Sequence, residues 1–234
     1  MPFQISGATV VVTGASSGLG RAVAHAFARQ GANLVLAARG REALEAVAGE
    51  CTELGARTLV VPTDARDPAA VAELATTASR LFGRIDAWID NAATATASGE
   101  PGRTHATDAV LPHFREQGRG VLVNIVTPRY PPVGFGAEST GAPGLSRFTE
   151  ALLEPLFDTP GVQVYEVDPG LIDAPGLRHG VVAERVLSLL RPPSLLDKAA
   201  RAGGAGVPVV PLVVAGAALV LVGAVVWAVS RQRR

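Results

Sequence analysis

A glycine-rich segment near the N-terminus has the residue types and the spacing of a phosphate-binding turn. It follows the apolar, β-branched run 8–13 and reads Thr13-Gly14-Ala15-Ser16-Ser17-Gly18-Leu19-Gly20. A strand that turns into a helix directs backbone N–H groups and the positive helix end at one point, which suits a pyrophosphate. Glycines let the backbone turn tightly and approach the ligand. The segment predicts a nucleotide site; a purely structural turn is the alternative.

The surrounding pattern supplies the elements that would position this turn. Apolar runs predict strands at 8–13, 33–38, 58–61, 85–89, 120–126 and 162–167. Helical spacing predicts helices at 18–30, 41–54 and 68–82, a further helix from about Thr140, and a short one near 108–117. Strands that alternate with helices imply right-handed crossovers and a parallel sheet covered on both faces. The expected fold class is α/β.

Further motifs follow in an order that resembles the short-chain dehydrogenase/reductase family. The turn has the spacing TGxxxGxG, Asp64 follows the third strand, Asn91-Ala92-Ala93 follow the fourth, and Asp168-Pro169-Gly170 follow the sixth. The resemblance covers roughly residues 5–190. It implies a doubly wound Rossmann-type sheet of about six strands, in the order 3-2-1-4-5-6. NAD or NADP would bind at the carboxyl edge of that sheet.

The residues after the second strand bear on the choice of cofactor. A carboxylate there would hold the ribose 2′-OH of NAD, but this chain has Ala37-Ala38-Arg39-Gly40-Arg41. A guanidinium matches a 2′-phosphate in charge and geometry, which favours NADP(H) over NAD(H); two solvated arginines are the alternative. By resemblance, Asp64 would accept a hydrogen bond from the adenine amino group, and Asn91 would line the adenosine ribose. Asp64 could equally be a helix cap. The full set of expected cofactor-binding residues is Thr13, Gly14, Ser16, Ser17, Gly18, Leu19, Gly20, Arg39, Asp64, Ala65, Asn91, Ala92, Pro169 and Gly170.

The catalytic half departs from the family pattern. The family uses a Ser, a Tyr and a Lys four residues after the Tyr, and the cation lowers the pKa of the Tyr that exchanges the proton. This chain has one lysine, Lys198, and no YxxxK. Alignment on residues 146–152 puts Glu138 at the Tyr position and Ala142 at the Lys position. The Ser position falls on Val126 or Thr127, of which Thr127 keeps a hydroxyl. The candidate catalytic residues are Thr127, Glu138 and Tyr130, although Tyr130 also suits a packing or interface role.

Two function classes follow from this departure. The first is an NADP(H)-dependent oxidoreductase that transfers a hydride between the nicotinamide and a carbonyl or alcohol substrate. The second is a family member that has kept the nucleotide site, lost catalysis, and works as a membrane-anchored binding or sensing module. Only 29 residues separate Asn91 from Val121, where the family usually has a long helix that forms much of the dimer interface. An oligomer therefore stays open, because the region that usually forms the dimer interface is shortened. No convincing seventh strand is seen in the sequence.

The C-terminal segment Val207–Val229 has 23 uncharged residues, whereas a bilayer-spanning helix needs about 20. Trp227 near its end and the basic tail 230–234 suit a lipid–water interface. The sequence predicts a transmembrane helix; a buried core helix and a shallow insertion are the alternatives. The expected organisation is a Rossmann domain at 1–195, a linker at 196–206, the span at 207–229 and the tail. No secretory signal is seen, so the domain is expected to face the cytoplasm.

Composition limits the other possibilities. The 234 residues carry 21 basic and 21 acidic side chains, with 48% hydrophobic residues, so neither a disordered chain nor a global basic field for nucleic acid is indicated. One cysteine, Cys51, leaves no disulfide framework within the chain. The four histidines are scattered and predict no metal site, and surface or packing roles are expected for them (His25, His105, His113 and His179).

Overall fold

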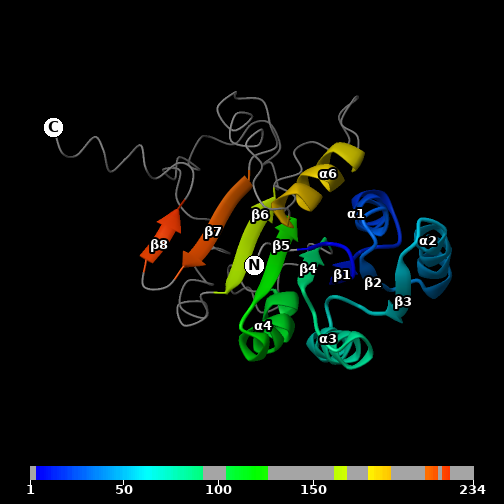
Figure 1. Cartoon of the computed structure of the whole chain (residues 1–234). Coiled ribbons are helices and arrows are strands. Elements are labelled where there is room, and N and C mark those ends of the chain that lie inside the picture. The colour runs from blue at the N-terminus through cyan, green and yellow to red at the C-terminus, as the bar shows by residue number, and fades with distance from the viewer. Residues whose placement is uncertain are drawn as a thin grey trace, which may run out of the picture.

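A mostly parallel β-sheet with helices on both faces forms the fold (Figure 1). The computed structural model describes residues 4–91, 104–125, 161–167, 179–190, 209–215 and 218–221. Its strands are β1 (Thr9–Thr13), β2 (Asn33–Ala38), β3 (Arg57–Pro62), β4 (Ala87–Asp90), β5 (Gly120–Ile125), β6 (Val162–Val167), β7 (Val209–Ala215) and β8 (Ala218–Leu221). Its helices are α1 (Gly18–Ala28), α2 (Arg41–Glu53), α3 (Pro68–Phe82), α4 (His105–Gln117) and α6 (His179–Leu190).

The strand order confirms the expected topology. The sheet runs β3-β2-β1-β4-β5-β6-β7-β8, and every pair from β3 to β6 is parallel. The first six strands therefore have the order 3-2-1-4-5-6. In such a sheet the order reverses beside β1, between β1 and β4, and ligands bind outside the carboxyl ends of the strands at that point.

Two hydrophobic clusters cover the two faces of the sheet. One cluster packs α1, α2 and α6 on one face, and the other packs α3 and α4 on the opposite face (Figure 1). Trp88 of β4 and Phe114 of α4 are fully buried in the second cluster. Central strands are buried along their length, as expected for parallel strands covered on both sides.

Local signals in the sequence explain where the helices begin and end. Asp67 caps α3 by accepting a hydrogen bond from the Ala69 N–H at 2.9 Å, and Pro68 supplies the fixed φ of the first turn. Gly83 ends this helix in the left-handed conformation. In α4, Thr104 caps the N-terminus and Gly118 ends the helix in the left-handed conformation. This helix begins three residues before the short helix expected near 108–117.

Strands β7 and β8 correct two expectations about the C-terminal segment. Residues 209–215 pair antiparallel with β6, and 218–221 pair antiparallel with β7, so a seventh strand is present. The same residues were expected in a transmembrane helix over Val207–Val229, and for them the helical assignment is wrong. An apolar run rich in Val fits a buried strand as well as a helix, because its periodicity does not separate the two. Among the residues that the structure describes, no helix has the length and apolar character needed to cross a bilayer.

Candidate cofactor site

The glycine-rich turn connects β1 to α1 at the carboxyl edge of the sheet. Gly14 and Gly18 have φ values of +63° and +54°, in the left-handed region where glycine carries no Cβ penalty. The Ala15 N–H donates a hydrogen bond of 3.1 Å to the Ala37 carbonyl at the end of β2. The turn is thus fixed between the ends of two neighbouring strands, where the sequence placed it.

Gly20 is needed for close approach rather than for an unusual φ. A Cβ at this position would overlap the Gly14 carbonyl oxygen and would lie 2.8 Å from Asn91 Nδ2. A Cβ on Gly14 would lie 2.9 Å from the same amide nitrogen. The two glycines therefore allow the first turn of α1, the loop and the Asn91 side chain to meet. This close packing is what a cradle for a phosphate group requires.

The N-terminus of α1 is open to an anion. Ser17 is the N-cap residue, but its side chain makes no capping hydrogen bond, and the first turn holds no acidic residue. The first N–H groups of a helix have no partner within the helix, and they carry the positive end of the dipole. A pyrophosphate fits this donor set, since it would satisfy those groups and complement their charge.

A buried hydrogen-bond network holds the turn against β4. Thr13 Oγ1 donates to Asp90 Oδ1 at 2.8 Å and accepts from the Asn91 N–H at 3.0 Å. Asn91 Nδ2 donates to the Gly14 carbonyl at 3.4 Å. Asp90 is buried, with only 5% of its surface exposed. Sequence reasoning placed Thr13, Gly14 and Asn91 here but missed Asp90; its position at the end of β4, directly before Asn91, was the signal.

Arg39 lies at the end of β2 and is exposed. It makes no hydrogen bond or ion pair with the residues that the structure describes. Its positive charge contributes to lowering the pKa of Asp64, so the two side chains are near each other. A guanidinium without a hydrogen-bond partner among the described residues is available to an incoming anion.

Asp64 is bound by Arg66 and does not cap a helix. Arg66 donates from its backbone N–H at 3.0 Å and from its guanidinium, with the shortest contact at 2.6 Å. These hydrogen bonds hold the pKa of Asp64 well below its usual range. The cap of α3 is Asp67, so the capping alternative for Asp64 is wrong. Ala65 follows in the same turn.

Several expected site residues lie outside the residues that the structure describes. These are the candidate catalytic residues Thr127, Tyr130 and Glu138, together with Ala142 at the Lys position. The expected cofactor contacts Ala92, Pro169 and Gly170 also lie outside. The described geometry therefore concerns the half of the site that would hold the adenosine and the pyrophosphate.

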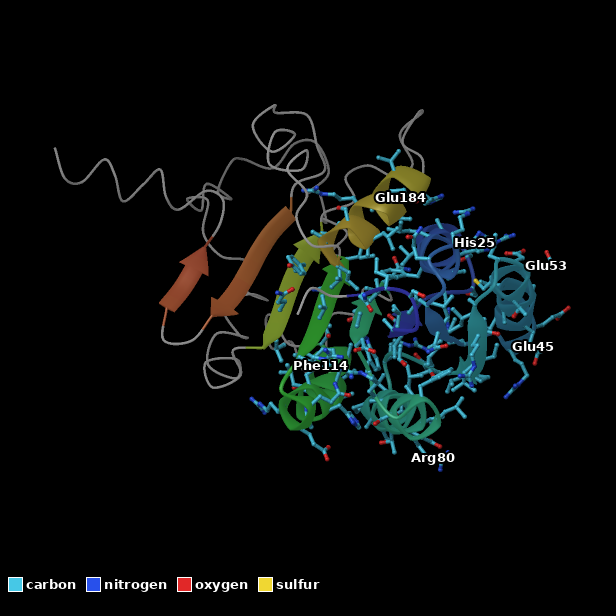
Figure 2. The ribbon with its side chains drawn as sticks, in the orientation of Figure 1. His25, Glu45, Glu53, Arg80, Phe114 and Glu184 are labelled. Carbon is cyan, nitrogen blue, oxygen red and sulfur yellow. The ribbon has the colours of Figure 1, made fainter. Side chains whose placement is uncertain are left out.

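Cys51 and the histidines form no second centre in the described residues, where no group of three metal-ligating side chains occurs. Cys51 is buried on α2, and burial raises the pKa of its thiol to about 11, so it is not a ready nucleophile. His25 Nε2 on α1 (labelled in Figure 2) lies 2.8 Å from Glu50 Oε2 on α2, and this contact joins the two helices.

Comparisons with known proteins agree with this geometry. A family model for short chain dehydrogenases matches residues 8–103. An uncharacterized oxidoreductase of Mycobacterium tuberculosis is 32% identical over 189 residues, which cover 73% of this chain and 71% of the relative. One from Bacillus subtilis is 32% identical over 191 residues, but the match covers only 53% of it, so the chain spans about half the length of that relative.

Among solved structures, a metagenomic short-chain oxidoreductase in complex with NADP superposes with a TM-score of 0.63. It is 27% identical, and the match covers 80% of this chain and 91% of that one. The family model, the relatives and this structure all point to one assignment, and it agrees with the glycine-rich turn at the carboxyl edge of a 3-2-1-4-5-6 sheet. The chain belongs to the short-chain dehydrogenase/reductase family of oxidoreductases.

Proposed function

We propose that this oxidoreductase uses NADP(H) in preference to NAD(H) and acts on a carbonyl or alcohol substrate. The observation that carries the preference is Arg39: an exposed cation without a described partner stands where NAD-binding members of such folds place an acid. The solved relative in complex with NADP supports the same cofactor. When bound, the nicotinamide supplies or accepts the hydride.

The roles of this chain's residues follow from their positions. The first N–H groups of α1 would bind the pyrophosphate, with Ser16 to Leu19 forming the wall of the turn. Arg39 would pair with the 2′-phosphate. Asp64 and Ala65 would border the adenine, and Asn91 the adenosine ribose. Because Arg66 already engages the Asp64 carboxylate, we expect this ion pair to fix the carboxylate in place before the adenine arrives.

Arg39→Asp is expected to reverse the cofactor preference. A charge-assisted contact to phosphate contributes about 1.5–3 kcal/mol, so NADPH should bind about 10- to 100-fold more weakly. NADH should bind as well or better, because the new carboxylate would accept from the ribose 2′-OH. Titration calorimetry with both cofactors measures the effect.

Arg80→Asp is the matched control for that substitution. It makes the same charge change near the C-terminal end of α3, on the other side of the sheet from α1 (Figure 2). The preference for NADPH should survive it. Equal affinities of the unaltered protein for NADPH and NADH would contradict the proposal.

A second candidate function is a nucleotide-binding module without catalysis. The specific observation in its favour is the absence of YxxxK from the whole sequence, with Lys198 as the only lysine. Such a protein would bind NADPH through the same turn and Arg39 but would not turn over substrate. Binding and turnover measured on one preparation separate the two candidates.

Membrane attachment, with the Rossmann domain facing the cytoplasm, stays a prediction. It is supported by the absence of charged side chains from residues 202–230. Full-length protein is expected in the membrane fraction, released by detergent but not by salt, and deletion of 207–234 should move it to the supernatant. If the full-length protein stays in the supernatant and the deletion lowers its melting temperature, the segment stabilises the sheet as β7. The prediction of membrane attachment is then wrong.

A further inference from the structure

The first residue of α6 lies against the phosphate turn. His179 begins α6, and a Cβ built on Gly18 would lie 3.7 Å from its Nε2 atom. Gly18 is the first residue of α1. An imidazole nitrogen therefore lies beside the helix end where the pyrophosphate is proposed to bind. The side chain of His179 is exposed, and it makes no hydrogen bond or ion pair with the described residues.

Packing between the two helices fixes this placement. Val182 and Val186 of α6 are fully buried in the same cluster as Val23 and Phe27 of α1. Figure 1 shows α6 lying beside α1 on one face of the sheet. Since His179 and Gly18 are the first residues of α6 and α1 and lie close together, the two helices begin side by side. The histidine is thus carried to the turn by a rigid element.

The charges around His179 suit a negative ligand. Neither α1 nor α6 has an acidic residue in its first turn. The open N–H groups of α1 contribute a partial positive charge at the same place. An imidazole N–H at this place would add a further donor to the backbone N–H groups of the turn and of α1.

We propose that His179 is a further cofactor-binding residue, which donates a hydrogen bond from Nε2 to the pyrophosphate of the dinucleotide. The inference rests on the proposed function, because it assumes that the turn binds a dinucleotide. It adds a residue from α6, far along the chain, to the expected contacts, none of which lies on that helix. If His179 binds the pyrophosphate, full affinity for the dinucleotide also requires that α6 is packed against α1.

The test separates the pyrophosphate from the rest of the cofactor. NADPH carries a pyrophosphate, whereas adenosine 2′-monophosphate has the adenine, the ribose and the 2′-phosphate without it. His179→Phe keeps a ring but removes the donor, and should weaken NADPH binding about tenfold. Its affinity for adenosine 2′-monophosphate should stay unchanged. His179→Gln keeps a donor and should bind NADPH within about threefold of the unaltered protein.

His113→Phe is the matched control. His113 lies on α4, which packs on the opposite face of the sheet, and its replacement should change neither affinity. If His179→Phe binds NADPH within about twofold of the unaltered protein, the inference is overturned and the proposed function is unaffected. Equal losses for both probes would indicate general damage to the site and overturn it as well. Unaltered protein that binds neither probe overturns the proposed function together with this inference.

Discussion

Gly20→Ala is expected to lower the free energy of unfolding by about 1–3 kcal/mol, the usual cost of forcing extra volume into a packed site. The added methyl group would overlap the Gly14 carbonyl oxygen and press on Asn91 Nδ2. The turn must then move away from α1, and the hydrogen bond from Asn91 to Gly14 is lost. A displaced turn no longer aims its N–H groups at one point, so NADPH affinity should fall at least about tenfold, a loss of roughly 1.4 kcal/mol.

Gly49→Ala is the control for Gly20→Ala, because both replace a helical glycine. A Cβ at Gly49 on α2 has no neighbour within 4 Å. Helix propensity alone then decides, and it favours alanine by about 0.5–1 kcal/mol. The two substitutions should therefore change the melting temperature in opposite directions. Thermal unfolding measured with and without NADPH checks both effects. A Gly20→Ala protein as stable as the original would show that the close approach at the turn is unimportant.

The parallel half of the fold was predictable because its signals are local. Each crossover from β1 to α3 combines a short apolar run, a turn residue and a helical pattern, and these fix the element boundaries to within a few residues. Asp67-Pro68 marks the start of α3 in the sequence and does so in the structure. The order 3-2-1-4-5-6 rests on the family resemblance, since periodicity alone does not choose between doubly wound topologies.

The sequence failed where the deciding contact is distant. Residues 209–215 are apolar enough for a membrane helix, and only their pairing with β6 makes them a strand. The sequence allowed Asp64 to be a helix cap, whereas in the structure Arg66 binds its carboxylate. Asp90 was missed because its partner Thr13 lies 77 residues earlier. A surface or packing role was expected for His179, and nothing near it in the sequence indicates that α6 begins beside Gly18.

The cofactor half and the catalytic half differ in what the sequence retains. The family pattern is kept in the turn glycines, the open end of α1 and Arg39. The structure brings the turn, Asn91 and β2 together. Glu138 and Ala142 depart from the family pattern, because they stand at the Tyr and Lys positions. Carbonyl reduction needs a proton donor beside the nicotinamide, and this pair would normally supply it. We therefore expect this protein to bind NADPH but to turn over substrate slowly.

Turnover by the unaltered protein is expected to be about 10²- to 10⁴-fold below that of a member with a positioned acid–base group. A Tyr needs an adjacent cation to give up its proton near neutral pH, and a carboxylate at position 138 would serve only with a raised pKa. NADPH oxidation with a panel of aldehydes, ketones and quinones measures the rate. NADPH affinity, determined on the same preparation, ensures that a low rate does not reflect an empty site.

The double substitution Glu138→Tyr and Ala142→Lys tests whether the missing pair is the cause. Together they restore the Tyr and the Lys at the family spacing, and the rate should rise, whereas Glu138→Tyr alone should have little effect because its phenol lacks the cation. Tyr130→Phe and Thr127→Ala examine the remaining hydroxyls as substitute donors. Rapid turnover by the unaltered protein that neither of these two substitutions abolishes would place the chemistry on other residues. Tight NADPH binding without turnover, with a gain only in the double variant, would support the binding module over the enzyme.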